Sequence, residues 1–182
     1  MFTREDRESF RQKSLALLRK AAIVITPAEA EGMEVTDLGV GDIENIGLQV
    51  VEYENNHRYC AKELIMTPWQ ICPEHRHPFV DSGNPGKMET FRCRYGEVYL
   101  YVEGESNPSP MARVPETYLP FLRVWHEIVL RPGEQYTIPT NGLHWFQAGP
   151  EGAVVSEFSS SSTDENDVFT DPRVARVGGS EE

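Results

Sequence analysis

The chain has few cysteines, few basic residues and no long apolar run. Its 182 residues include three cysteines, Cys60, Cys72 and Cys93, and none of them forms a Cys-x-x-Cys pair. This odd, scattered set indicates free thiols rather than a disulfide framework. No segment approaches the roughly 18 apolar residues that a membrane-spanning helix needs, and the charged start is unlike a secretory signal. We therefore expect a cytoplasmic protein without a membrane partner.

Basic side chains are too scarce to favour a nucleic-acid partner. The sequence has 17 lysines and arginines against 29 aspartates and glutamates, which gives a formal net charge of −12. No net positive field is available to hold a phosphate backbone or an anionic membrane surface. A small neutral ligand or a metal ion remains compatible with this charge, because the total says nothing about one pocket. The length and a hydrophobic content of 39% predict one globular domain.

The N-terminal part of the chain carries two helix-start patterns. The segment Thr3–Asp6 resembles a helix cap, and Thr26–Glu29 is a stronger signal, with a threonine cap, a proline at the first helical position and a following carboxylate. We expect residues 1–33 to form a helical segment that packs on a β-barrel of residues 34–175. We expect the remaining residues, 176–182, to form a mobile tail.

Short runs rich in valine, isoleucine, tyrosine and phenylalanine recur from about residue 34, separated by glycine, proline and asparagine. Many short strands at this spacing predict an antiparallel sandwich or barrel. One run alternates cleanly, with Val98, Leu100 and Val102 facing one way and Tyr99 and Tyr101 the other. The expected strands are Leu48–Glu54, Arg58–Met66, Met88–Tyr95, Glu97–Glu103, Val124–Leu130, Gln135–Ile138, Leu143–Gln147 and Val154–Phe158.

His75 and His77 are the first candidates for metal ligands. At positions i and i+2 of a strand, their side chains point to the same face about 7 Å apart, so both rings can reach one ion. His-x-His alone is equally compatible with two surface histidines beside a proline-rich turn. Further ligands are needed to decide between these interpretations.

Glu89 and His144 extend the pair to four donors. Glu89 lies on the next expected strand, twelve residues after His77, and His144 follows the turn Pro139–Gly142. Three imidazoles and one carboxylate leave two positions of an octahedron open, and this set suits Mn, Fe, Co, Ni or Zn. The lack of a thiolate argues against a closed structural zinc site.

These motifs resemble the two cupin motifs and, more closely, the D-lyxose isomerase family of the cupin superfamily. The His-x-His pair, a glutamate with a glycine seven residues later, and a late Pro-x-x-Gly-x-His carry the likeness. The commoner cupin spacing places the acidic ligand three or four residues after His-x-His, where this chain has Asp81, so the resemblance makes Asp81 a rival for Glu89. Asp81 stands in a turn-forming stretch where aspartate is common for backbone reasons, and the longer loop before Glu89 is what the isomerase family shows. The likeness covers roughly residues 45–175, through Pro73–Pro78, Gly86–Gly96, Leu130–Gln135, Pro139–Phe146, Val155–Ser159 and Asn166–Phe169.

The resemblance implies a mainly β fold, a cupin-type double-stranded β-helix (jelly-roll) barrel with one or two N-terminal helices. It implies that the barrel holds one divalent metal, usually manganese. The activity it implies is metal-dependent aldose–ketose isomerisation of a small neutral monosaccharide, D-lyxose to D-xylulose and also D-mannose to D-fructose. It also implies a homodimer.

Lys87 and Glu157 are the candidate catalytic residues. Proton transfer between C1 and C2 through an enediolate needs a base, and a metal would stabilise the new negative charge. Glu157 lies in an apolar strand, where a carboxylate is costly, but the strand parity also allows it to face outward. Lys87 lies two residues before Glu89 and should share its face; the alternative is a solvated lysine after a glycine turn.

Two other functions are compatible with the same four ligands. A cupin dioxygenase would use iron to activate oxygen, and a non-catalytic sugar-binding or metal-binding cupin would need no base. Lys87 and Glu157 favour the isomerase over both. Asp164, Asp167 and Arg173 follow the last expected strand and could either close over the sugar or line a dimer contact.

Overall fold

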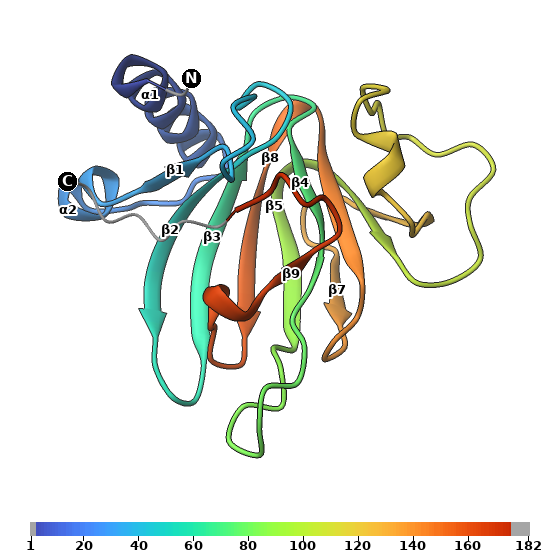
Figure 1. Ribbon diagram of the computed structural model, residues 1–182. Coiled ribbons are helices and arrows are strands. Elements are labelled where there is room, and N and C mark those ends of the chain that lie inside the picture. Colours follow the sequence, from blue (N-terminus) through green and yellow to red (C-terminus); the bar gives the residue numbers. More distant parts are fainter. Residues whose placement is uncertain (1–2, 176–182) are drawn as a thin grey trace.

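The computed structural model describes residues 3–175, so the tail predicted for residues 176–182 lies outside the described residues. The described part contains two α-helices and a curled sheet of nine antiparallel strands (Figure 1). In chain order the elements are α1 (Arg4–Lys20), α2 (Pro27–Glu31), β1 (Glu34–Thr36), β2 (Leu48–Asn55), β3 (Cys60–Met66), β4 (Ile71–Arg76), β5 (Glu89–Val102), a 3₁₀ turn (Leu119–Phe121), β6 (His126–Leu130), β7 (Gln135–Ile138), β8 (His144–Ser159), a second 3₁₀ turn (Asp164–Asn166) and β9 (Val168–Phe169).

Both helices begin at the caps that the sequence predicts. The Thr3 hydroxyl accepts the backbone N–H of Asp6, and the Asp6 carboxylate accepts the backbone N–H of Thr3 in return. Thr26 and Glu29 make the same reciprocal pair at the start of α2, whose first residue is Pro27. Each capping box satisfies two backbone donors that the first helical turn leaves without partners.

Strand β8 organises the sheet, because it pairs with three other strands. Its second half lies between β3 and β5, and its first half lies between β4 and β5. Strands β1 and β2 extend the sheet beyond β3, while β6 and β7 pair with β5. The short strand β9 pairs with β4, so the end of the described chain returns to the sheet beside β4 (Figure 1).

Two strands are longer than the sequence predicts. The runs expected at Met88–Tyr95 and Glu97–Glu103 belong to the single strand β5, and those expected at Leu143–Gln147 and Val154–Phe158 belong to β8. The break that the two expected strands leave at Gly96 is therefore wrong. This glycine has a φ of 70° and lies inside β5, where the register with β8 shifts. A bulge at a residue that tolerates positive φ bends the strand without ending it.

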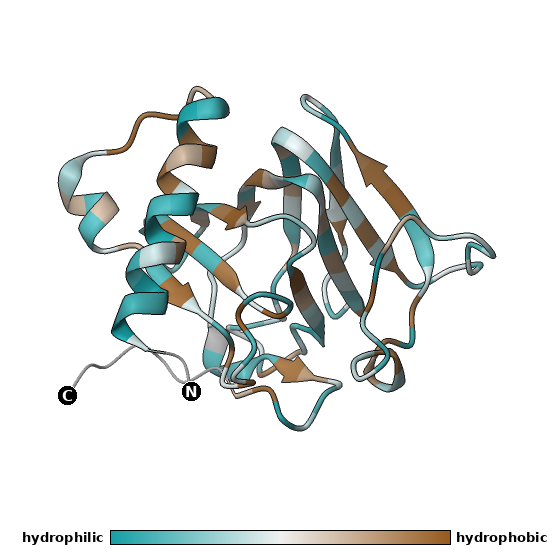
Figure 2. Ribbon diagram, turned by 90° about the horizontal axis from the view of Figure 1, so that it is seen from above, coloured by the Kyte–Doolittle hydropathy of each residue, from teal (hydrophilic) through white to brown (hydrophobic). Residues whose placement is uncertain are grey.

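Apolar side chains pack on both faces of the sheet. Val98, Leu100 and Val102 lie in an interior core, whereas Tyr99 and Tyr101 lie in an outer core under the segment 103–125. A third cluster lies between α1 and the outer face of the sheet. Figure 2 shows hydrophilic residues on the outward turns of α1 and hydrophobic residues on the strands beneath it. Neither helix within residues 3–175 is long and apolar enough to cross a membrane.

Candidate metal centre

Four donor side chains come together inside the curled sheet. His75 lies in β4, His77 follows that strand, Glu89 begins β5 and His144 begins β8. One donor atom from each residue lies within 4.8 Å of the others, and all four residues are buried. The Nε2 atoms of His77 and His144 are 3.2 and 3.0 Å from Oε1 of Glu89. Residues that span seventy positions of sequence therefore surround one point.

In two of the histidine rings, Nε2 faces this point because Nδ1, the outer nitrogen, makes a hydrogen bond to the backbone. Nδ1 of His75 donates to the carbonyl of Pro73 at 2.8 Å, and Nδ1 of His144 donates to the carbonyl of Gly142 at 2.9 Å. A carbonyl only accepts, so each neutral ring carries its lone pair on Nε2. In His144 that lone pair faces a carboxylate oxygen of Glu89, which is also an acceptor. A cation between the two resolves this opposition, so the donor set fits a divalent metal.

Lys87 lies between two carboxylates next to these donors. Its Nζ is 2.8 Å from Oε2 of Glu89 and 2.5 Å from Oε1 of Glu157. Lys87 and Glu157 are both buried, so the solvent-facing alternatives that the sequence left open do not apply. Glu157 points inward because its register partners on β3 and β5 are Lys62 and Phe91, which also line the interior. Ion pairs thus join Glu89 of the donor cluster through Lys87 to the candidate base.

Burial and opposite charges set the ionisation of this group. Burial alone lowers the pKa of Lys87, but Glu157 and Glu89 outweigh it and hold that pKa above its ordinary value. Burial raises the pKa of Glu89, yet Lys87 and His77 hold it well below its usual range. Despite burial, the Glu89 carboxylate helps raise the pKa of His77 to about 9, whereas burial holds the pKa of His75 well below its usual range. The buried charges therefore compensate one another.

A narrow cavity is lined by three of the four donors, His75, His77 and Glu89. It offers about 30 Å³ of space to solvent, room for about two water molecules. Apart from the ionisable residues, its lining is mainly apolar: Leu38, Leu48, Val50, Leu64, Phe91, Phe146 and Phe169. Lys62 also lines it, a residue that the sequence analysis missed. The signal was present, because Lys62 alternates with Leu64 and Met66, two members of the interior core.

Two acidic side chains close to the histidines in sequence accept hydrogen bonds from backbone N–H groups. Asp81, the rival ligand, is exposed and accepts the backbone N–H groups of Gly83 and Asn84 at 2.7 and 3.0 Å. It therefore builds a turn and is not one of the four clustered donors. Glu74 is buried and accepts the backbone N–H of Arg123 at 2.6 Å, which fastens the segment 103–125 to β4.

The segment after β8 carries the residues whose role the sequence left open. Asp167 contacts Nδ1 of His77, and the ring of Phe169 lies 5.2 Å from the ring of His75. Asp167 therefore supports the donor cluster directly. This contact could not be predicted, because it depends on how β9 returns to β4.

Arg173 lies away from the donors. Its guanidinium pairs with Asp171 at 2.6 Å and lies over the rings of Tyr118 and Phe121. It thereby anchors the end of the described chain on the outer side of the sheet. The side chain of Asp164 is outside what the structure describes.

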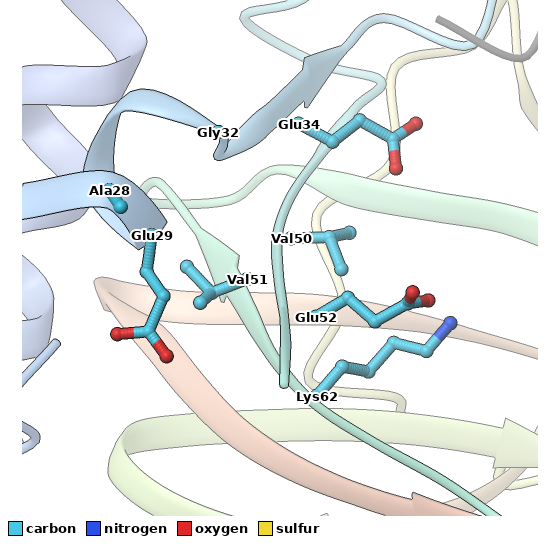
Figure 3. Close-up of a pocket in the computed structure, with 8 residues that line it drawn as sticks. All are labelled: Ala28, Glu29, Gly32, Glu34, Val50, Val51, Glu52 and Lys62. Atoms are coloured by element: carbon cyan, nitrogen blue, oxygen red, sulfur yellow. The ribbon is translucent and has the colours of Figure 1, made fainter. Parts of the chain in front are cut away.

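A larger groove lies at the edge of β2 beside α2 (Figure 3). It offers about 460 Å³ to solvent, and its polar lining consists of Glu29, Glu34, Glu52 and Lys62. Figure 3 shows the side chains of Glu52 and Lys62 next to one another, as expected for paired residues of β2 and β3. The groove shares Val50 and Lys62 with the cavity at the donors. It has no histidine, so the donor chemistry belongs to the cavity.

No family model matches the chain, but two curated relatives align with nearly all of it. A D-lyxose ketol-isomerase of Thermofilum sp. (strain ex4484_79) is 61% identical over 177 residues, which cover 97% of this chain and 98% of the relative. A D-lyxose/D-mannose isomerase of Thermosediminibacter oceani is 61% identical over 170 residues, which cover 93% of each chain.

Solved structures support the fold. The L-ribose isomerase of Acinetobacter sp. DL28, in complex with L-ribose, superposes with a TM-score of 0.77 at 16% identity and covers 94% of each chain. At this identity the likeness bears on architecture alone. It confirms the predicted mainly β fold with its curled antiparallel sheet and N-terminal helices.

Proposed function

Because this chain belongs to the D-lyxose ketol-isomerase family, and is therefore an aldose–ketose isomerase, we propose that it interconverts D-lyxose and D-xylulose, and also D-mannose and D-fructose. One observation carries the proposal. A buried lysine–glutamate pair, Lys87 and Glu157, lines the same cavity as two imidazoles and a carboxylate of the four-donor cluster. A dioxygenase or a binding module would need the donors but not this acid–base pair.

We propose that His75, His77, Glu89 and His144 hold one divalent ion, with Mn²⁺ as the first candidate and Co²⁺, Ni²⁺, Fe²⁺ or Zn²⁺ as alternatives. A donor set of nitrogen and oxygen without sulfur supports this choice. When bound, the ion supplies a Lewis acid that stabilises negative charge developing on the sugar oxygens. The protein's own residues then have to move the proton.

Glu157 is the proposed base. Its carboxylate takes the proton from C2 of the aldose; the electron pair of that C–H bond forms the double bond between C1 and C2, and the π pair of the C1 carbonyl moves onto O1. The same carboxylate returns the proton to C1 as the carbonyl forms at C2, and the ketose is complete once the proton of the 2-hydroxyl has moved to O1. Burial of Glu157 within an apolar lining supports this role, because bulk water is kept away from the transferred proton.

Lys87 is the proposed partner on the oxygen side. The carboxylates around it hold its pKa above the ordinary value, so it rests as an ammonium group. As an ammonium it donates a hydrogen bond to the oxygen on which negative charge develops. The proton of the 2-hydroxyl must also reach O1 in each cycle, and Lys87 can donate to one oxygen and accept from the other. Its position between Glu89 and Glu157 supports this function.

Anaerobic assays of metal-loaded variants test the proposal. The wild type should convert D-lyxose to D-xylulose without oxygen, and His144→Ala should lose metal and activity together. Glu157→Gln should keep its metal but lose turnover by about 100- to 10,000-fold. Glu151→Gln removes an exposed carboxylate from the same strand and should leave turnover unchanged. Full activity of Glu157→Gln would remove it from the mechanism, and turnover that requires oxygen would indicate a dioxygenase.

We further propose a homodimer in the cytoplasm. The exposed side chains of Tyr59, Met88 and Phe158 line an open groove on the sheet, and burial of such an apolar surface against a second copy would remove it from water. Three free, buried cysteines support a reducing compartment. Light scattering on the purified protein tests the dimer, and a monomer mass at micromolar concentration would contradict it.

A further inference from the structure

His77 differs from the other two histidine donors in what holds its outer nitrogen. His75 and His144 each donate to a backbone carbonyl two residues earlier. Nδ1 of His77 instead contacts the carboxylate of Asp167, which is 90 residues away in the sequence. The Asp167 side chain is 3% exposed, so this contact is buried. One ring of the three therefore depends on a different element for its orientation.

Asp167 belongs to a short segment that crosses the donor site. The next two residues form β9, in which Phe169 pairs with His75 of β4 and lines the cavity. Thr170 then donates twice to Glu74, from its backbone N–H at 3.0 Å and from its hydroxyl at 2.7 Å. The segment is thus fixed to β4 on one side and to a metal-ligand candidate on the other.

We propose that Asp167 is a positioning residue that fixes the ring of His77 with Nε2 toward the metal, and thereby couples the metal to the crossing segment. This inference rests on the proposed metal site. It assigns Asp167 a role through His77, the donor that its carboxylate contacts, and no contact with the sugar.

A carboxylate on the outer nitrogen has two effects, and a backbone carbonyl has only one of them. Both groups fix the tautomer that leaves the lone pair on Nε2, but the negative charge also makes the imidazole a stronger donor to a metal. Coupling between sites is reciprocal, so a metal held by His77 must in turn hold the segment around Asp167 more firmly. Phe169 lines the cavity two residues after Asp167, so the contact with His77 also holds this part of the cavity wall.

Titration of the metal-free protein with Co²⁺, followed by its visible absorption bands, tests the proposal. Asp167→Asn keeps an acceptor for Nδ1–H but lacks the charge, and we expect Co²⁺ to bind about 10- to 100-fold more weakly with shifted bands. Asp167→Glu restores the charge and should recover part of the affinity. Glu165→Gln removes an exposed carboxylate from the same segment and should bind as the wild type does.

The outcomes separate this inference from the proposed function. Wild-type affinity and bands in Asp167→Asn would overturn the positioning role and leave the metal site standing, whereas a wild-type protein that binds no Co²⁺ would overturn both. Hydrogen exchange on the wild type gives a test that needs no variant. The backbone amides of Val168 and Phe169 should exchange about 5-fold or more slowly with Co²⁺ bound; equal rates would contradict the coupling.

Discussion

Lys87 is the cation that separates the two buried carboxylates of the site. Its Nζ lies 2.8 Å from Glu89 and 2.5 Å from Glu157. Removal of a single partner from a buried ionic group leaves the remaining charge without compensation, which costs more than the group as a whole contributes. Both the chemistry and the stability of the site should therefore respond to a change at this residue.

Lys87→Met should lower kcat by about 100-fold or more and should also lower the midpoint of thermal unfolding. The methionine fills similar space but neither donates a proton nor compensates Glu157. Steady-state kinetics with D-lyxose and circular dichroism on heating measure the two effects. Lys13→Met is the control, because it removes a lysine from a surface pair with Glu44. Unchanged kcat in Lys87→Met would show that Glu157 acts without it.

Glu63 carries a pH dependence of stability outside the reaction centre. It is buried, and its two carboxylate oxygens accept the hydroxyl of Ser156 at 2.9 and 3.0 Å. Burial raises its pKa above the ordinary 4.5, although Ser156 and Arg94 oppose the shift. Because the folded pKa is the higher one, folding favours the protonated form. Its stabilising contribution is present below pH 4.5 and is lost as the pH rises through the folded pKa.

Glu63→Gln should therefore unfold at a higher temperature than the wild type at pH 7.5, with the difference shrinking as the pH is lowered to 4. Glutamine keeps an acceptor for Ser156 and carries no buried charge. Thermal unfolding at the two pH values measures this difference. Glu116→Gln, a change at an exposed glutamate, should show no such pH-dependent gain. A Glu63→Gln protein that is less stable at pH 7.5 would mean that the ionised carboxylate is fully compensated.

Side chains that alternate regularly could be predicted, and those placed by a distant return of the chain could not. His75, His77, Glu89 and His144 follow strand periodicity and turn residues, and these signals are local. Asp167 reaches His77 only because β9 pairs with β4. Nothing in its own neighbourhood distinguishes it from a surface aspartate.

The antiparallel pairing of β5 and β8 includes a close approach of their two backbones at Gly96 and Gly152. A Cβ at Gly96 would lie 2.0 Å from the carbonyl oxygen of Gly152, and the φ of Gly96 is +70°. Gly133 also has a positive φ, +93°, but a Cβ there would have no neighbour within 4 Å. Alanine substitutions at these two positions therefore distinguish the free-energy cost of a positive φ from the cost of steric overlap.

Gly133→Ala should lower the free energy of unfolding by about 1–2 kcal/mol, the cost of a left-handed conformation for a residue with a Cβ. Gly96→Ala should lower it by about a further 1–3 kcal/mol or more, because the overlap forces β5 and β8 apart. Urea unfolding of both variants measures the difference. Equal losses would indicate that the strands separate at no cost.

Gly96 also explains why the sequence predicts two short strands where the fold has one long strand. Gly96 and the pair Gly149 and Gly152 have turn-forming residue types, so the sequence predicts two short strands at each place. In the fold, β5 and β8 pair on both sides of these glycines, and the ladder continues through register shifts. Distant pairing outweighs the local signal there. The helix caps at Thr3 and Thr26 could be predicted because a cap involves only residues within one turn.

At the scale of the whole molecule, the proposed metal site can form only in the folded chain. Its donors come from β4 and the residue directly after it, His77, and from the starts of β5 and β8, and the segment before β9 holds one of their rings. An unfolded chain cannot present these groups at one point, so a metal binds the folded state selectively. Selective binding stabilises a protein by a free energy that grows with the ratio of free ligand to its dissociation constant.

Mn²⁺ at about 100 times its dissociation constant should therefore stabilise the protein by about 2.7 kcal/mol, which corresponds to a rise of about 5–10 °C in Tm for a chain of this length. Thermal unfolding in Mn²⁺ and in excess chelator measures the shift. His144→Ala lacks one donor and should show little of it, whereas His57→Ala changes an exposed loop residue and should keep all of it. An equal shift in His144→Ala would place the stabilising ion elsewhere on this acidic surface, and a wild-type protein with the same Tm in both solutions would contradict the selective binding on which the site depends.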